Sequence, residues 1–292
     1  MNAFTIKDLE NLSGIKAHTI RIWEQRYSFL SPSRTDTNIR YYSNDELKTI
    51  LNIALLNKYG FKISHIDRMT PKEMNEKILS LTQFQAQQER IVNELVTNMV
   101  DLNMEAFEAL LGNHIMAKGI EKTITQIIFP FLEKIGILWL TNHVNPAQEH
   151  LVTNIIRQKL IVGIESANSH INLNKTILLF LPESEYHELG ILFMYYMLKS
   201  RGAKVVYLGA NVPLKDIVYV AELKKPDFLY THLTSVAGNF IFEKFINNIT
   251  QKLPQFQVVV SGQVVGGYKK AIPSNISLKH SLSEVMEYVS SL

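Results

Sequence analysis

The stretch Pro182-Glu183-Ser184-Glu185-Tyr186-His187-Glu188-Leu189-Gly190 separates two segments with different hydrophobic patterns. Residues 175–181 form a short apolar run, which is typical of a buried strand, and residues 191–199 continue in a helical pattern. The stretch is therefore predicted to be a loop between a strand and a helix. In open α/β sheets, ligands bind in the crevice outside the carboxyl ends of the strands, and this loop would lie there.

An imidazole and a carboxylate stand two residues apart in this loop. His187 can ligate a metal through one ring nitrogen while Glu185 orients the other nitrogen, and Gly190 follows three residues later. A single histidine in a loop is also typical of an ordinary solvated side chain. The loop by itself leaves both interpretations open.

The chain after the loop alternates short apolar runs with helical segments. Strands are predicted at residues 176–181, 204–208, 227–233, 257–260 and 275–278. This alternation predicts a Rossmann-like (flavodoxin-like) parallel sheet with helices on both faces. There is no G-x-G-x-x-G motif, which argues against a dinucleotide site of the usual kind.

The chain before the loop is helical from about residue 71 to residue 168. Breaks near residues 101–103, 116–119 and 141–146 divide it into four segments with short connections, which predicts a four-helix bundle. Trp139 is followed, after nine intervening residues, by Glu149-His150. A tryptophan in a bundle is usually a core residue, so this spacing carries no function by itself.

The N-terminal region is predicted to form a helix-turn-helix. One helix begins after Thr5 and ends at Ser13-Gly14, and a second runs from about Lys16 to Tyr27. The second helix of such a motif enters the major groove of DNA. Residues 30–42 contain two arginines and two tyrosines and are predicted to form a β-hairpin wing along the phosphates.

Composition and charge agree with this organisation. The 292 residues are 46% apolar and 20% charged, which is typical of a soluble protein of two or three domains. Residues 1–70 contain 10 Lys/Arg and 7 Asp/Glu, so the whole net charge of +3 lies there and favours a nucleic-acid partner. The absence of cysteine excludes disulfides, thiolate metal sites and cysteine nucleophiles. Neither a signal peptide nor a membrane span is apparent, so a cytoplasmic location is expected.

Residues 3 to about 70 resemble the winged helix-turn-helix of the MerR family of transcription regulators. The resemblance is carried by Thr19-Ile20-Arg21-Ile22-Trp23-Glu24-Gln25-Arg26-Tyr27, then Pro32, then Arg40-Tyr41-Tyr42-Ser43. It implies a double-stranded DNA operator and at least a dimer. The residues that it implies for DNA contact are Lys16, His18, Thr19, Arg21 and Arg26 on the recognition helix, and Arg34, Arg40 and Tyr41 on the wing.

The bundle followed by Glu185-x-His187-x-x-Gly190 resembles the cobalamin-binding module of methionine synthase and related proteins. The signature of that family is Asp-x-His-x-x-Gly, a later Ser-x-Leu and a still later Gly-Gly. The resemblance implies that His187 binds cobalt, that Glu185 holds the tautomer of His187, and that small residues after the third and fourth strands leave a slot for the displaced nucleotide tail. The implied counterparts of the two later motifs are Thr231-His232-Leu233 and Ser261-Gly262.

The whole chain resembles the light-responsive, cobalamin-dependent repressors of carotenoid genes (the CarH, CarA and LitR family). The resemblance implies that Trp139, Glu149 and His150 cap the upper face of adenosylcobalamin, and that the dark state is a tetramer. The photoreceptor type of this family has a histidine after the capping tryptophan, but this chain has Leu140, which cannot ligate cobalt. We therefore expect any photoproduct to lack a second histidine ligand, unless His143 substitutes.

Together these patterns predict a multidomain α and α/β protein. The predicted domains are a winged helix-turn-helix at residues 1–75, a four-helix bundle at 76–170 and a Rossmann-like sheet at 171–292. The expected function is DNA-binding transcriptional regulation, as a repressor, with oligomerisation or DNA affinity controlled by adenosylcobalamin, and no enzymatic activity. In the alternative, the C-terminal region no longer binds cobalamin and a protein partner, such as an antirepressor, controls the regulator. The changes at Glu185 and Ser261 from the family signature favour this alternative.

Overall fold

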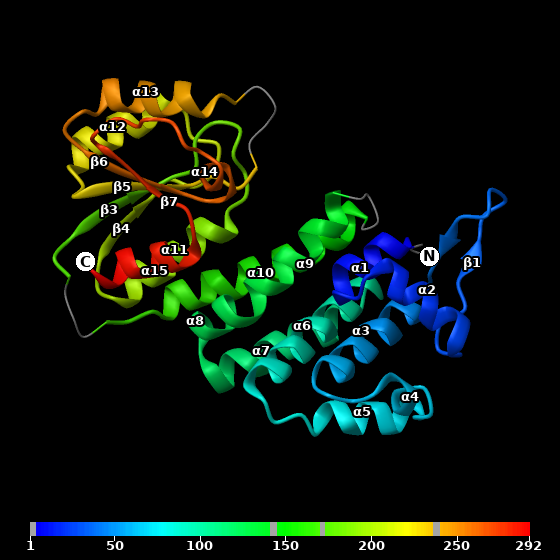
Figure 1. The fold of residues 1–292 in the computed structure, drawn as a ribbon. Helices are drawn as coiled ribbons and strands as arrows, with labels where there is room; N and C mark the ends of the chain where they lie inside the picture. Colours follow the sequence, from blue (N-terminus) through cyan, green and yellow to red (C-terminus); the bar gives the residue numbers. More distant parts are fainter. Residues whose placement is uncertain (1–3, 141–144, 170–172, 236–239) are drawn as a thin grey trace. The chain divides into compact units, whose positions relative to one another are not determined.

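The structure is a computed structural model. It describes residues 4–140, 145–169, 173–235 and 240–292, and only the backbone of residues 137–140. The chain divides into two compact units, Met1–Ile155 and Ile156–Leu292, and the division falls within helix α10 (Pro146–Ser166) (Figure 1). The finer boundaries predicted at residues 75 and 170 stay predictions. No helix in the described ranges is both long and apolar enough to span a membrane.

The first unit begins with the predicted helix-turn-helix. Helices α1 (Ile6–Ser13) and α2 (Ala17–Arg26) are joined by a short turn in which Gly14 has φ +75°, a conformation that favours glycine. Strands β1 (Ser33–Arg34) and β2 (Arg40–Tyr41) pair in antiparallel fashion and form the predicted wing. Helices α3 (Asn44–Lys58), α4 (Ile63–Ile66) and α5 (Pro71–Leu79) follow.

The wing is joined to helix α2 by a nearly buried carboxylate. Glu24 on α2 accepts a 2.9 Å hydrogen bond from Arg40 Nε and another from the Tyr42 hydroxyl. Tyr42 is completely buried. Burial and the Glu24 carboxylate raise the pKa of Tyr42, so its hydroxyl stays protonated and donates the bond. The angle between wing and helix therefore depends on Glu24.

The bundle helices are α6 (Phe84–Val100), α7 (Met104–Lys118), α8 (Ile120–Thr123), the π-helix η1 (Ile124–Ile128), α9 (Phe129–Leu140) and α10. The predicted breaks near residues 101 and 116 are confirmed, and the third falls on residues 141–144, outside the described residues. A further break, not predicted, separates α5 from α6. There the Ser80 hydroxyl bonds back to the Lys77 carbonyl at 2.7 Å and helps to end α5.

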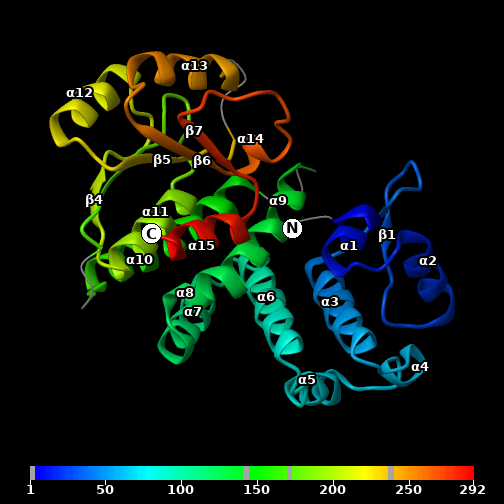
Figure 2. The ribbon, with the colours of Figure 1, turned by 60° about the vertical axis from the view of Figure 1, so that its left-hand side comes forward.

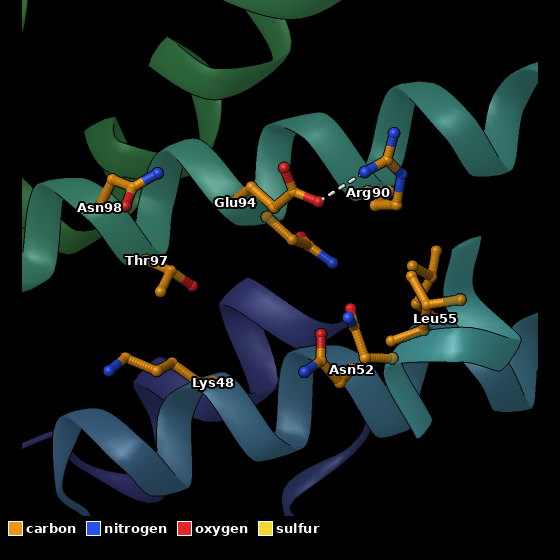
Figure 3. Close-up of a pocket in the computed structure, with 10 residues that line it drawn as sticks. Lys48, Asn52, Leu55, Arg90, Glu94, Thr97 and Asn98 are labelled. Atoms are coloured by element: carbon orange, nitrogen blue, oxygen red, sulfur yellow. Dashed lines mark hydrogen bonds and ion pairs between the residues drawn. The ribbon is translucent and has the colours of Figure 1, made fainter. Parts of the chain in front are cut away.

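The helix-turn-helix, the wing and helices α3 to α5, together called the head, pack against the bundle within this unit. Helix α3 packs against α6, and α1 against α9 (Figure 2). Between α3 and α6 lies a cavity of about 210 Å³ lined mainly by amide and charged side chains, including the Arg90–Glu94 ion pair (Figure 3). Such a polar lining can hold water, so the interface between α3 and α6 combines apolar packing with a polar, hydrated part.

One backbone carbonyl links the head to the start of α10. The buried amide of Gln148 donates to the carbonyls of Met99 and Val100, at 3.3 and 3.0 Å, at the end of α6. The Asn44 amide, at the start of α3, also donates to the Val100 carbonyl, at 3.5 Å. The residue before Glu149-His150 and the first residue of α3 therefore share one acceptor.

The second unit is a five-stranded parallel sheet. Its strands are β3 (Thr176–Leu179), β4 (Lys204–Tyr207), β5 (Phe228–His232), β6 (Gln257–Ser261) and β7 (Ile276–Lys279), in the order β4-β3-β5-β6-β7. This is the flavodoxin-like order, and all five predicted strands are confirmed. The order reverses between β3 and β5, which is where such sheets bind ligands.

Helices cover both faces of the sheet. Helices α12 (Leu214–Lys224) and α13 (Phe242–Lys252) lie on one face, and α11 (Leu189–Ser200) and α15 (Leu282–Ser290) on the other (Figure 1). A short helix, α14 (Gln263–Gly266), follows β6. Leu229, Leu233 and Val260 belong to the apolar core with α12 and α13. Because side chains alternate along a strand, Tyr230 and His232 face α11.

The Glu24 junction can be tested with Tyr42→Phe. The change removes a hydrogen bond to a nearly buried carboxylate, and we expect it to lower the free energy of unfolding of the first unit by about 1.5–3 kcal/mol. Both tryptophans, Trp23 and Trp139, lie in this unit, so urea unfolding followed by tryptophan fluorescence reports on it. The matched control is Tyr41→Phe, at an exposed tyrosine, which should change the midpoint little. Equal midpoints for the two variants would contradict the assigned role of Glu24.

Candidate functional site

The loop after β3 is organised around the buried carboxylate of Glu185. Its Oε1 accepts hydrogen bonds from the backbone N–H groups of Tyr186 and His187, both at 2.9 Å. Its Oε2 accepts from the backbone N–H groups of Thr234 and Ser235, at 2.8 and 3.1 Å, in the loop after β5. One side chain thus joins the two loops on either side of the point where the strand order reverses.

These hydrogen bonds keep Glu185 ionised. Burial opposes ionisation and would raise the pKa of Glu185, but the bonds from the ring and backbone of His187 and from the Thr234 N–H outweigh it and hold the pKa below its ordinary value. A carboxylate that accepts several bonds from backbone N–H groups needs no cation to remain charged. Glu185 is therefore a negatively charged acceptor at neutral pH.

His187 receives its orientation from that carboxylate. Its Nδ1 lies 2.6 Å from Glu185 Oε1, and because an ionised carboxylate only accepts, Nδ1 carries the proton and donates. Nε2 is then the basic nitrogen, the form in which an imidazole ligates a metal. The side chain is 45% exposed, so a ligand can reach it. The pair predicted from the sequence is thus brought together with the geometry of an oriented metal ligand.

The next residue anchors the start of α11. Glu188 accepts a 2.7 Å hydrogen bond from the Tyr207 hydroxyl on β4 and pairs at 2.7 Å with Arg157 on α10. Burial and the Glu188 carboxylate raise the pKa of Tyr207, which keeps its hydroxyl a donor. On the other side, the Ser184 N–H donates to Asn211 Oδ1 at 3.0 Å. The loop is therefore held from β4 as well as from β5.

Gly190 lies against a residue that the sequence analysis did not select. A Cβ added to Gly190 would lie 2.3 Å from Cδ2 and 2.4 Å from Nε2 of His232, so the imidazole packs directly on the backbone of α11. Nδ1 of His232 lies 2.8 Å from Ser261 Oγ, and the Tyr230 hydroxyl lies 2.5 Å from the same oxygen. The sequence offered one signal that His232 belongs to the site: it stands at the end of a predicted strand between Thr231 and Leu233, which were both predicted site residues.

The other residues predicted after β5 and β6 divide between two faces. Thr231 is buried on the face of α12 and α13, and its hydroxyl finds no hydrogen-bond partner among the described residues. Leu233 is buried in the same core, and its N–H donates to the Ser261 carbonyl at 2.8 Å. Gly262 has φ +104°, and a Cβ there would lie 2.3 Å from the Leu233 carbonyl oxygen. Of this set, Ser261 is the residue brought close to Gly190, through His232.

The residues predicted to cap the upper face lie in the first unit or at its edge. Glu149 and His150 are adjacent on α10, with His150 Nδ1 3.3 Å from Glu149 Oε2 and the His150 side chain largely exposed. Trp139 and Leu140 belong to the end of α9, but their side chains lie outside the described residues, as does all of His143. The cap formed by Trp139, Glu149 and His150 therefore stays a prediction.

The predicted DNA-contacting residues fall into two groups. The exposed ones are Lys16, His18, Arg21, Arg26, Arg34 and Tyr41, and Thr19 is half-buried with its hydroxyl 3.3 Å from His18 Nε2. Arg40 differs from these, because its guanidinium is partly buried and paired with Glu24. In this position Arg40 holds the wing against α2, whichever contact it makes with DNA. Trp23, on the same helix, is buried and belongs to the core of this unit.

The contact between Gly190 and His232 can be tested by a double-mutant cycle. Gly190→Ala should lower the free energy of unfolding of the second unit by about 1–3 kcal/mol, because the new methyl group meets a ring held by Ser261. In a His232→Ser background the same change should be neutral or stabilising, because alanine favours a helix over glycine by about 1 kcal/mol. Urea unfolding followed by the circular dichroism of the chain measures both. Equal costs in the two backgrounds would contradict the contact.

Comparison with known proteins connects the first unit, up to and just beyond its end within α10, to two families. Residues 4–73 match the family described as MerR HTH family regulatory protein, and residues 91–162 match the family described as B12 binding domain. The HTH-type transcriptional repressor CarH of Myxococcus xanthus is 26% identical over 258 residues, 86% of this chain and 86% of CarH. The HTH-type transcriptional repressor CarA of the same organism is 25% identical over 269 residues, 91% of this chain and 89% of CarA.

A solved structure agrees in fold. The monomethylamine corrinoid protein of Methanosarcina barkeri superposes with a TM-score of 0.51 at 13% identity, over 70% of this chain and 100% of that protein. At this identity the likeness concerns the fold alone. The two family matches and the two repressors lead to one identification: the chain is a MerR-type DNA-binding regulator with a B12-binding domain, distantly related to the CarH and CarA repressors.

Proposed function

We propose that this regulator is a repressor whose oligomerisation and DNA affinity are controlled by adenosylcobalamin bound in the C-terminal unit at His187. The observation that carries the proposal is the Glu185–His187 pair. A buried, ionised carboxylate fixes the ring so that Nε2 could ligate the cobalt of a bound corrinoid. His187 would hold the metal, and Glu185 would hold His187 and both loops beside it.

A path from the bundle to the DNA-binding head supports control by a cofactor. Glu149 and His150, which are proposed to cap the upper face, directly follow Gln148, whose amide is bonded to the end of α6. The carbonyl of Val100 that receives this bond is also bonded by Asn44 at the start of α3. A shift of the start of α10 would therefore change the support of the helix that follows the wing.

Light is the signal that we propose for this repressor. The chemistry that adenosylcobalamin supplies is a cobalt–carbon bond that light can break. Because Leu140 follows Trp139, the chain offers no imidazole at that position that could bind cobalt in place of an adenosyl group. We therefore expect the illuminated protein to show the spectrum of a cobalamin with one histidine ligand rather than two.

The second candidate function is a regulator that a protein partner controls without cobalamin. The observation in its favour is the imidazole of His232, which packs against Gly190 where the family resemblance implies an open slot. Under this alternative, DNA binding does not depend on any corrinoid. The two candidates thus differ in a property that mutation of His187 measures directly.

His187→Ala should separate them. Under the proposed function, the variant loses the cobalt ligand and retains little or no adenosylcobalamin after desalting in the dark, and its DNA affinity no longer responds to the cofactor. The absorption spectrum, a DNA-binding titration and size-exclusion chromatography, each before and after green illumination, are the measurements. His280→Ala is the matched control, at an exposed histidine of the same unit. Unchanged, cofactor-dependent DNA binding in His187→Ala would refute the role of His187.

DNA binding by the head can be tested with Arg21→Ala. Arg21 is exposed on α2, and loss of a base or phosphate contact costs about 1–3 kcal/mol, so the affinity for an operator should fall by a factor of about 5 to 150. If the contact is to phosphate, the slope of the logarithm of affinity against the logarithm of salt concentration should also become shallower by about 1, as expected for one phosphate contact fewer. Lys224→Ala, at an exposed lysine of α12 in the other unit, makes the same change in net charge and should leave the affinity unchanged. Equal effects of the two variants would show that α2 does not enter the groove.

A further inference from the structure

The carboxyl ends of β5 and β6 are closed, on the face of α11, by a cluster of three polar side chains. His232 and Ser261 are the last residues of the two strands and lie opposite each other in the register. The Tyr230 hydroxyl and His232 Nδ1 both lie within hydrogen-bond distance of Ser261 Oγ, at 2.5 and 2.8 Å. Ser261 and Tyr230 are buried. The imidazole is therefore held in one position from the sheet side.

The helix side of the same ring is in contact with Gly190. Only a residue without a Cβ leaves room there, since an added Cβ would lie 2.3–2.8 Å from three ring atoms. Burial lowers the pKa of His232 to about 4, so the ring is neutral at physiological pH and needs no counter-ion. An imidazole thus fills the space between the start of α11 and the ends of β5 and β6.

This space is next to the proposed cobalt ligand. His187 lies in the loop after β3, and Gly190 follows three residues later in the first turn of α11. The Glu185 carboxylate accepts hydrogen bonds both from His187 and from the backbone directly after β5. In complete cobalamin the nucleotide tail is tethered to the lower side of the corrin ring. When a protein histidine replaces the base of that tail, the tail needs room on the side of the histidine. Here the residues fit the cobalt, but the position of His232 does not fit the tail.

We propose that His232 occupies the place of the nucleotide tail, so that the site favours a corrinoid without a tail over complete cobalamin. Complete cobalamin binds only when the ring swings out of the cluster. That movement gives up the hydrogen bond to Ser261 and the packing on Gly190. The proposal rests on the proposed binding of a corrinoid at His187 and specifies which corrinoid the site prefers.

The test compares adenosylcobalamin with adenosylcobinamide, which has the same upper ligand and no nucleotide tail. The full chain is titrated with each in the dark, and binding is followed by the absorption spectrum and by equilibrium dialysis. We expect the wild type to bind adenosylcobinamide about fivefold to thirtyfold more tightly, which corresponds to about 1–2 kcal/mol for a lost hydrogen bond and its packing. His232→Ser should tighten the binding of adenosylcobalamin by a similar factor and leave that of adenosylcobinamide within about threefold.

Two further variants keep the test independent of folding. Ser261→Ala removes the bond that holds the ring but leaves the ring in place, so it should shift the preference in the same direction by a smaller factor. His280→Ser makes the matched change at an exposed histidine and should shift nothing. The circular dichroism of each variant shows whether the fold is retained.

The outcomes distinguish this inference from the function on which it rests. Equal affinities of the wild type for the two corrinoids, or equal gains for both in His232→Ser, would overturn the role of His232 and leave control by cobalamin standing. Failure of the wild type and of all variants to bind either corrinoid would overturn the proposed function as well. A preference for adenosylcobinamide that His232→Ser abolishes would support the inference.

Discussion

The hydrogen bonds to the buried carboxylate of Glu185 are the interaction on which the candidate site depends. They join the loop after β3 to the loop after β5 and hold the proton of His187 on Nδ1. A buried charge is tolerated only when several donors surround it, and here backbone N–H groups from two loops are those donors. The orientation of His187 thus depends on the loop after β5 as well as on its own loop.

The DNA-binding head also contains a carboxylate that joins two segments through hydrogen bonds. Glu24 is a nearly buried carboxylate whose partners, Arg40 and Tyr42, lie far from it in sequence. It positions the wing on the recognition helix as Glu185 positions His187. In both units, a buried or nearly buried acid accepts hydrogen bonds from a separate segment of the chain and so helps to fix the geometry of a candidate site. The exposed candidate residues lie next to these acids: Arg21 is on the same helix as Glu24, and His187 is bonded to Glu185.

Much of the fold could be predicted because its patterns are local. The five strands, the helix-turn-helix and the breaks near residues 101 and 116 follow from hydrophobic periodicity, caps and glycines, and the structure confirms them. The loop of Glu185 and His187 could likewise be placed between a strand and a helix. The face of the sheet on which Thr231 lies could not be predicted in this way. Its burial on the α12 side follows from a one-residue register along β5, which a short apolar run leaves open.

The sequence by itself determined that the chain joins a MerR-like head to a corrinoid-type fold, and that a carboxylate and an imidazole stand two residues apart at a ligand-binding edge. Only the tertiary structure decided what surrounds that pair. The bonds of Glu185 to residues after β5, and the packing of His232 on Gly190, join residues more than 40 apart in the chain. No local pattern encodes such contacts, because they exist only when parallel strands end side by side under one helix.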